Sequence, residues 1–223
     1  MLVKIFFLGR PGSGKTTAIQ ELCDIAHHRA YSTICMDDYH ILSRMSQEDT
    51  QRKKFRTTDY GGFDVLDPTV FDTALEILEQ QVQTALQTER DGIITIEFAR
   101  NDYRQTLRRF SPDFLKDAYI FFIEADLNTC IQRIRQRATN PITGSKRHFV
   151  SDYIMHTYYS KDNWTYIIDE MKAEYTINKT IATYYNTGSL PELLEVVNEF
   201  AEHLFDHEFC LHNSLLQPSK GRS

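Results

Sequence analysis

Residues 2–17 read LVKIFFLGRPGSGKTT, an apolar run that stops at a glycine-rich turn. The run predicts a buried strand over 2–8 that ends at Gly9. Residues 15–28 place apolar side chains on one face at helical spacing, so we expect a helix there. A strand, a glycine-rich loop and a helix therefore follow one another directly.

This loop matches the pattern GxxxxGK[ST] with Gly9, Gly14, Lys15 and Thr16. Glycines allow backbone N–H groups to surround phosphate oxygens, and the start of the helix adds the positive end of its dipole. We expect Lys15 to reach the β- and γ-phosphates of ATP and the Thr16 hydroxyl to bind Mg²⁺. The residues predicted to hold ATP are Gly9, Arg10, Pro11, Gly12, Ser13, Gly14, Lys15, Thr16 and Thr17.

The rest of the chain alternates between apolar runs and helical patterns. Further strands are expected at 31–36, 92–99, 118–125 and 179–186, and long helices at 67–90, 127–137 and from 190 onward. Near-continuous apolar strands that alternate with helices indicate an α/β fold with helices on both faces of the sheet. We therefore predict a P-loop NTPase three-layer sandwich with a five-stranded, mainly parallel sheet and a short lid.

One domain is expected over 1–206, followed by a tail at 207–223. Within the domain, 38–66 is polar and contains Gly61-Gly62, which favours an irregular or partly helical insertion that binds substrate. The segment 138–150 is predicted to be the lid.

Carboxylates follow two of the predicted strands. Asp37 and Asp38 end the second strand and Glu97 ends the third, where ligands of parallel sheets bind. Glu97 is a candidate to hold Mg²⁺ through water. A kinase also needs a carboxylate to take the proton from the attacking hydroxyl, and we assign Asp37 to this role. Asp38 either turns away, caps the next segment or assists the metal.

Several segments, in this order, carry a resemblance to the uridine kinase, nicotinamide riboside kinase and phosphoribulokinase group. They are CMDDYH (35–40), GGFDVLDPTVFDTALEIL (61–78), IITIEF (93–98), IQRIRQRATNPITG (131–144) and NTGSLPELLEVVNEF (186–200). The resemblance covers most of 1–205. It implies an ATP- and Mg²⁺-dependent kinase of a nucleoside or related sugar compound.

The same resemblance implies roles for individual residues. Asp37 would be the base, Thr16 and Glu97 would lie at the metal, and Arg133 and Arg137 would be the lid arginines. The two arginines are four positions apart, so they share a helix face. The planar guanidinium group suits phosphate oxygens.

Further residues are candidates for contact with the acceptor: Asp38, Tyr60, Phe63 and Arg100. Arg100 either meets a substrate anion or pairs with a nearby acid. Phe63 and Tyr60 either stack on a base or pack within their loop. Tyr158, Tyr159 and Trp164 are expected to pack rather than to clamp a base.

The net charge of −6 disfavours a long nucleic acid as the partner, because such a partner needs a broad basic face. The basic run RKKFR (52–56) keeps a polynucleotide or sugar-nucleotide kinase open as an alternative. A non-catalytic ATP-binding protein is the other alternative.

We expect a cytoplasmic monomer or homodimer that acts on a small molecule and has no membrane segment. The four cysteines form no CxxC motif and are expected to be reduced and mostly buried.

Overall fold

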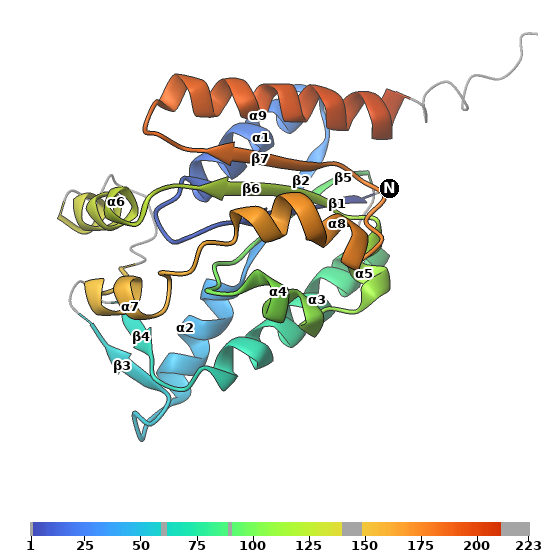
Figure 1. Ribbon diagram of the computed structural model, residues 1–223. Helices are drawn as coiled ribbons and strands as arrows, with labels where there is room; N and C mark the ends of the chain where they lie inside the picture. Colours follow the sequence, from blue (N-terminus) through green and yellow to red (C-terminus); the bar gives the residue numbers. More distant parts are fainter. Residues whose placement is uncertain (1, 59–61, 89–90, 140–148, 211–223) are drawn as a thin grey trace, which may run out of the picture.

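Five parallel strands form the central sheet of the computed structural model, which describes residues 2–58, 62–88, 91–139 and 149–210. Across the sheet the order is β2-β5-β1-β6-β7 (Figure 1). The strands are β1 (Leu2–Leu8), β2 (Ser32–Asp37), β5 (Gly92–Glu97), β6 (Tyr119–Glu124) and β7 (Ile181–Tyr185). The predicted five-stranded α/β fold is confirmed, and every pairing in this sheet is parallel.

Helices cover both faces of this sheet (Figure 1). One face carries α1 (Lys15–His28) and α9 (Leu190–Phe205), and the other carries α3 (Thr69–Thr88). The remaining α-helices are α2 (Asp38–Glu48), α4 (Tyr103–Thr106), α5 (Pro112–Lys116), α6 (Leu127–Thr139), α7 (Asp152–Thr157) and α8 (Met171–Glu174). In the part of the chain that is described, no helix is long and apolar enough to cross a bilayer.

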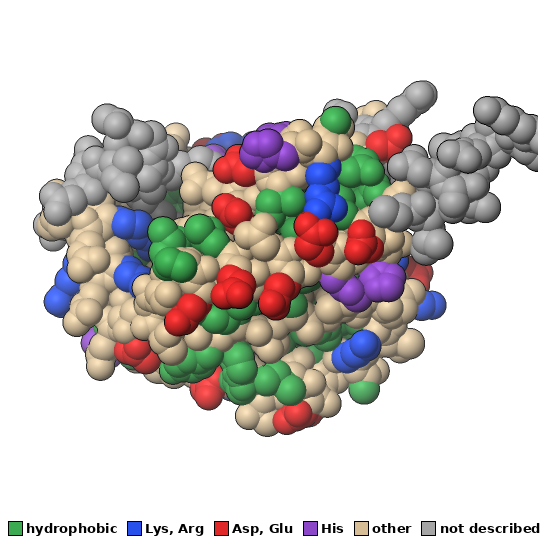
Figure 2. Space-filling model, turned by 90° about the horizontal axis from the view of Figure 1, so that it is seen from above, with side chains coloured by type: hydrophobic (Ala, Val, Ile, Leu, Met, Phe, Trp, Pro, Cys, Tyr) green, Lys and Arg blue, Asp and Glu red, His purple; other side chains and the backbone are tan. Residues whose placement is uncertain are grey.

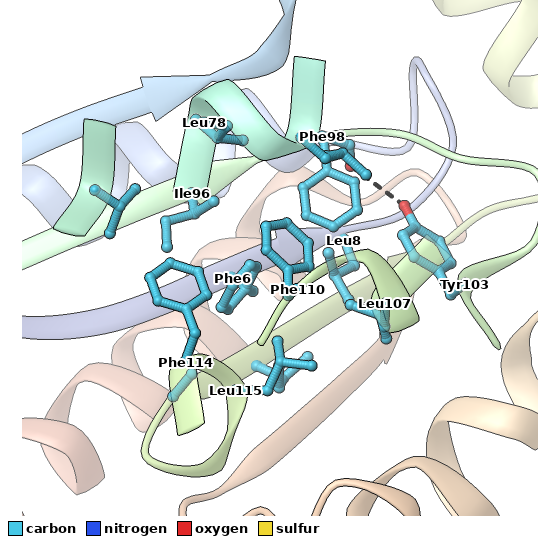
Figure 3. Packing of buried hydrophobic residues seen from close by; sticks show 14 of the residues in the cluster. Phe6, Leu8, Leu78, Ile96, Phe98, Tyr103, Leu107, Phe110, Phe114 and Leu115 are labelled. Carbon is cyan, nitrogen blue, oxygen red and sulfur yellow. Dashed lines mark hydrogen bonds between the residues drawn. The ribbon is translucent and has the colours of Figure 1, made fainter. Parts of the chain in front are cut away.

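The central strand β1 is apolar apart from Lys4, because both of its faces are buried. Successive side chains of a strand point to opposite faces, so Phe6 packs in the cluster beneath α3 while Phe7 packs beneath α1 and α9. Figure 3 shows Phe6 surrounded by aromatic rings, with centroids 5.4 Å from Phe110 and 5.8 Å from Phe114. Packing on both faces holds the end of β1, and the loop that follows it, in a fixed position.

The insertion after β2 is more regular than the sequence predicted. It consists of α2 and an antiparallel hairpin of β3 (Phe55–Thr57) and β4 (Phe63–Val65). The carboxylate of Asp49 accepts hydrogen bonds from the backbone N–H groups of 53, 54 and 55, which turns the chain from α2 into β3. Short strands such as these leave little periodic signal in a sequence.

The end of the domain also differs from the expected boundary at 206. A helical turn, η4 (Asp206–Cys210), continues directly from α9. Phe209 is buried with its ring centroid 4.2 Å from that of Tyr31, and Glu208 forms an ion pair with Lys179. Residues 207–210 therefore belong to the folded body, and the rest of the predicted tail lies outside the described residues.

Two cysteines that are distant in sequence meet in space. The Sγ atoms of Cys23 on α1 and Cys35 on β2 are 3.5 Å apart. Cys23 and Cys130 are buried as expected, whereas Cys35 is exposed because β2 is an edge strand.

Acidic side chains are spread across the described part of the face that carries α9 (Figure 2). Basic side chains are scattered, most of them toward the edges of the view, and form no continuous area (Figure 2). Long nucleic acids need a continuous basic surface, and this face does not provide one.

Candidate functional site

At three positions, the loop from β1 to α1 adopts a backbone conformation that favours glycine. Gly9, Gly12 and Gly14 have φ angles of 138°, 83° and 116°, a region that strains other residues. A Cβ atom on Gly9 would lie 2.1 Å from the carbonyl oxygen of Ile123, and one on Gly12 would lie 2.6 Å from that of Cys130. The loop therefore packs its backbone directly against the end of β6 and the start of α6.

Replacement of this first glycine is expected to damage the loop. Gly9→Ala would combine the clash with Ile123 and backbone strain worth about 1–3 kcal/mol. We expect a lower melting temperature and weaker ATP binding, measured by calorimetry.

Gly188→Ala is the matched control, because Gly188 also has a positive φ of 124° but its nearest neighbour would lie 3.8 Å from the new Cβ. If both variants lose the same stability, the close approach to Ile123 has no separate effect.

Lys15 is the first residue of α1 and is buried, with 5% of its surface exposed. Its ammonium group donates hydrogen bonds to the carbonyl oxygens of Gly9 (3.0 Å) and Arg10 (2.9 Å). Burial lowers the pKa of Lys15, and the nearby Glu97 carboxylate acts in the opposite direction. The positive charge is thus held inside the loop at the N-terminus of α1, where anions bind readily.

Thr16 and Glu97 place oxygen atoms beside the loop. The Thr16 hydroxyl lies 3.4 Å and 3.5 Å from the two carboxylate oxygens of Glu97, which ends β5. Burial raises the pKa of Glu97, Lys15 lowers it, and Asp37 and Asp38 raise it further. Several carboxylates therefore repel one another here, which is an environment that a divalent cation would relieve.

The oxygen donors at this point fit Mg²⁺. Magnesium is commonly held by one or two carboxylates together with substrate phosphates and water. Within the described ranges, no three His, Cys, Asp or Glu side chains form a group that could hold a metal. The Thr16 and Glu97 oxygens thus suit a metal that is shared with a bound nucleotide rather than enclosed by protein.

The two adjacent acids have different environments. Asp37 ends β2 opposite Glu97 and caps α2, accepting a hydrogen bond of 3.0 Å from the backbone N–H of His40. Asp38 is buried and lies 2.5 Å from the guanidinium group of Arg100, which is also buried. Arg100 thus pairs with a nearby acid, which is one of the two alternatives predicted for it, and it also lines the cavity described below.

The ion pair of Asp38 balances a large desolvation cost. Burial raises the pKa of Asp38, while Arg100 lowers it. For Arg100, burial lowers the pKa, but the Asp38 charge outweighs this effect and the net shift is upward. Each group thus keeps the other charged inside the protein.

The two arginines of α6 lie at different places. Arg133 donates to the carbonyl oxygens of Gly12 and Ser13 at 3.3 Å and to the Asn186 side chain at 3.1 Å, so it braces the loop. Arg137 borders the same cavity, and its pKa is lowered by burial and raised by Glu97. Most of the predicted lid, 140–148, lies outside the described residues.

A single cavity of about 1090 Å³ connects these groups. Lys15, Thr16, Asp37, Asp38, Glu97, Arg100, Arg133 and Arg137 all line it. Phe63 and Tyr158 also line it, although Tyr158 was expected only to pack. Tyr60 is not among the described residues. Such a volume can accept a nucleotide together with a small second ligand.

Three supporting residues were not singled out from the sequence. The Tyr103 hydroxyl accepts a hydrogen bond of 2.7 Å from the backbone N–H of Gly9. The Asn186 side chain donates to the Ser13 carbonyl at 2.7 Å. Glu124 forms a buried ion pair with Arg10, whose side chain therefore turns away from the phosphate site and leaves only its backbone there. Glu124 and Asn186 lay in the predicted strands 118–125 and 179–186, whereas Tyr103 lay outside any predicted element.

Comparison with known proteins identifies a family and several structures of similar fold. A family described as AAA domain (AAA_33) matches residues 5–152, which is more than half of the chain. No curated protein matches the sequence. Among solved structures, the chain is similar to a sugar kinase from Janibacter sp. HTCC2649, with a TM-score of 0.53, 14% identity and coverage of 91% of this chain and 95% of that one.

Two other structures are similar to the same extent. Shikimate kinase from Acinetobacter baumannii in complex with shikimate has a TM-score of 0.50 and 12% identity, covering 94% of this chain and 96% of that one. The tunicamycin resistance protein of Deinococcus radiodurans has a TM-score of 0.52 and 13% identity, covering 92% and 96%. At these identities the likeness shows the fold, which is that of the P-loop kinases.

Proposed function

The chain belongs to the AAA domain family, and from its site we propose that it is a kinase that uses Mg²⁺ and ATP to phosphorylate a hydroxyl group of a small acceptor. The observation that carries the proposal is one cavity lined by the phosphate loop, the Thr16–Glu97 oxygens, the Asp37–Asp38 pair and two arginines. Phosphoryl transfer needs these elements around one reacting centre.

ATP is bound by the loop 9–17 in this proposal. The backbone N–H groups and the Lys15 ammonium group would bind the phosphates. The Thr16 hydroxyl and the Glu97 carboxylate would hold Mg²⁺, which would supply positive charge to the phosphate oxygens. Arg137 stabilises the transferred phosphoryl group, while Arg133 keeps the loop in shape.

Asp37 is the proposed base. The acceptor hydroxyl oxygen attacks the γ-phosphorus, its proton passes to Asp37, and the bond from the γ-phosphorus to the β–γ bridging oxygen breaks to release ADP. The capping bond from His40 holds Asp37 at the strand end. Asp38 is occupied by Arg100 and therefore serves to position this region.

The resemblance to the uridine kinase, nicotinamide riboside kinase and phosphoribulokinase group supports a nucleoside or related sugar compound as the acceptor. The basic run 52–56, which favoured a polynucleotide, lies at the β3–β4 hairpin. There Arg56 pairs with Asp64, so one positive charge of the basic run is already balanced by an acid.

The proposal is tested with γ-labelled ATP, Mg²⁺ and pooled nucleosides, sugars and vitamins. We expect a labelled product that disappears when EDTA removes the metal. A protein that binds ATP but labels no acceptor from any pool is not a small-molecule kinase.

Glu97→Gln is expected to raise the Mg²⁺ concentration needed for half-maximal transfer. Residues that hold a metal through water typically contribute about 10–100-fold to affinity. A magnesium titration of the transfer rate measures the shift. Glu195→Gln is the control for loss of one negative charge, because Glu195 is on α9 but does not line the cavity. If the Glu97 variant needs the same Mg²⁺ concentration as the wild type, Glu97 does not hold the metal.

A further inference from the structure

Two cysteines meet at the wall of the cavity, although neither has a part in the proposed reaction. Cys23 is on α1 and Cys35 is on β2, and their Sγ atoms are 3.5 Å apart. Cys35 is exposed and lines the cavity, whereas Cys23 is buried, with 8% of its surface exposed. A dissolved molecule can therefore reach one thiol of the pair, and the second thiol lies directly behind it.

The contact between the two sulfur atoms favours Cys35 as the thiol that reacts first. A hydrogen bond with Cys35 raises the pKa of Cys23, and burial raises it further. Cys23 thus keeps its proton, which leaves the exposed Cys35 to attack, because the thiolate is the nucleophile. Once the sulfur of Cys35 is bonded to another sulfur, it carries no charge, and the largest cause that holds the proton on Cys23 is removed.

The pair joins the two elements that carry the main groups of the proposed reaction. Lys15, Ile19 and Cys23 follow one another at four-residue spacing and are all buried, so they share one face of α1. Cys35 and Asp37 are two positions apart on β2, so they share one face of the sheet. A bond between the two sulfur atoms would connect the helix of the phosphate loop to the strand of the proposed base.

We propose that Cys23 and Cys35 are a site of reversible oxidation, at which a low-molecular-weight disulfide such as glutathione disulfide converts the two thiols into an intramolecular disulfide. The covalent link does not depend on the proposed kinase function. Its effect on phosphoryl transfer rests on that function.

The exchange takes place in two steps. The sulfur of Cys35 attacks one sulfur of glutathione disulfide, the S–S bond of the oxidant breaks, and the first glutathione leaves with the proton lost by Cys35. The sulfur of Cys23 then attacks the sulfur of Cys35, displaces the second glutathione and gives it the proton of Cys23. The two protein thiols are thus oxidised by two electrons, and glutathione disulfide is reduced to two thiols.

The new bond is expected to displace the strand that carries Asp37. An S–S bond is about 2.05 Å long, so the two sulfur atoms must come closer than their separation of 3.5 Å. Helix α1 packs against both the sheet and α9, whereas β2 is at the edge of the sheet beside β5. We therefore expect β2 to move. Misplacement of a reacting group by about 1 Å can cost about 10²-fold in rate.

Mass spectrometry tests the link without any assay of transfer. Trypsin cleaves after Arg29 and separates peptide 16–29, which contains Cys23, from peptide 30–44, which contains Cys35. After treatment with glutathione disulfide and then iodoacetamide, we expect the two peptides to be joined. Dithiothreitol should separate them again.

Two variants test the order of the steps. Cys23→Ala stops the exchange after the first step, so Cys35 should keep its glutathione. In Cys35→Ser the remaining thiol is buried and should not react. Cys130 is the internal control, because it is buried with its Sγ 3.9 Å from the carbonyl oxygen of Ala125, and it should be neither linked nor glutathionylated. If wild-type Cys35 keeps glutathione without joining Cys23, or if neither cysteine reacts, the proposed site is wrong.

The effect on transfer is measured with γ-labelled ATP before and after oxidation, and each protein is compared with its own untreated rate. We expect the linked wild type to retain about a tenth of its rate or less and to recover it with dithiothreitol. The rate of Cys35→Ser should not respond to the oxidant. An equal loss in Cys35→Ser would show that the link is not the cause.

The link and the kinase function can fail separately. A protein that forms the link but transfers phosphate in neither redox state supports the oxidation site and contradicts the kinase function. A protein that transfers phosphate but never forms the link supports the kinase function and overturns the site. If the link forms and the rate is the same in both states, the displacement of Asp37 is contradicted.

Discussion

Asp37→Asn is expected to lower the rate of phosphoryl transfer by about 10²–10⁴-fold, the range typical of a lost general base. The amide has almost the same shape as the carboxylate but cannot accept the proton of the acceptor hydroxyl. Binding of ATP, measured by calorimetry, should change little, because the phosphate loop 9–17 is untouched. The expected defect is therefore in kcat rather than in nucleotide affinity.

The stability of this variant should be nearly that of the wild type. Asp37 caps α2 through the backbone N–H of His40, and asparagine is as good a capping residue as aspartate. A thermal melt that matches the wild type, together with a collapsed transfer rate, would identify a chemical role.

Asp38→Asn is the matched comparison. We expect it to lower the stability of the fold, whereas Asp37→Asn lowers the transfer rate at nearly unchanged stability. Asp38 and Arg100 are both buried, so removal of the acid charge leaves an uncompensated guanidinium group inside the protein. Breaking a buried pair in this way costs about 3–5 kcal/mol. Denaturant unfolding should show this loss. If Asp38→Asn remains stable yet loses transfer, and Asp37→Asn does not, the base is Asp38.

The local patterns of the sequence predict the elements of this fold well. The run 2–8 and the helix 15–28 occur with these bounds, because strand burial and helical spacing are properties of adjacent residues. Ser189 also caps α9 as its sequence suggests, accepting a hydrogen bond from the backbone N–H of Glu192.

Pairings between distant elements could not be predicted in the same way. Asp37 faces Glu97 because β5 lies between β2 and β1, and no periodicity encodes the order of strands. The same limit applies to the Asp38–Arg100 pair, which the sequence left as one of two alternatives.

The position of Tyr158 illustrates a further limit. An aromatic residue in a short helical segment packs in most cases, and Tyr158 does stack on Phe71. That it also borders the cavity depends on where α3 and α7 meet, which is decided by tertiary contacts. The place of such a residue at the cavity wall is visible only once the cavity is known.

Lys15→Met is expected to lower phosphoryl transfer by about 10²–10³-fold, as is usual when a single group that stabilises developing charge is removed. Methionine keeps most of the length and apolar surface of the side chain but carries no charge. ATP affinity should also fall, because the ammonium group contacts the phosphates before the reaction as well as during it. Isothermal titration and the labelled-ATP assay measure the two effects separately.

Lys4→Met is the matched control, because Lys4 is also on the β1–α1 segment and also buried, with 7% of its surface exposed. Its ammonium group pairs with Asp117 and donates to the carbonyl oxygen of Phe114, away from the cavity. Transfer by this variant should equal that of the wild type. Because both substitutions remove one buried positive charge, an equal loss of transfer would mean that Lys15 acts through the stability of the sheet. A loss confined to Lys15 means that its charge acts on the phosphates.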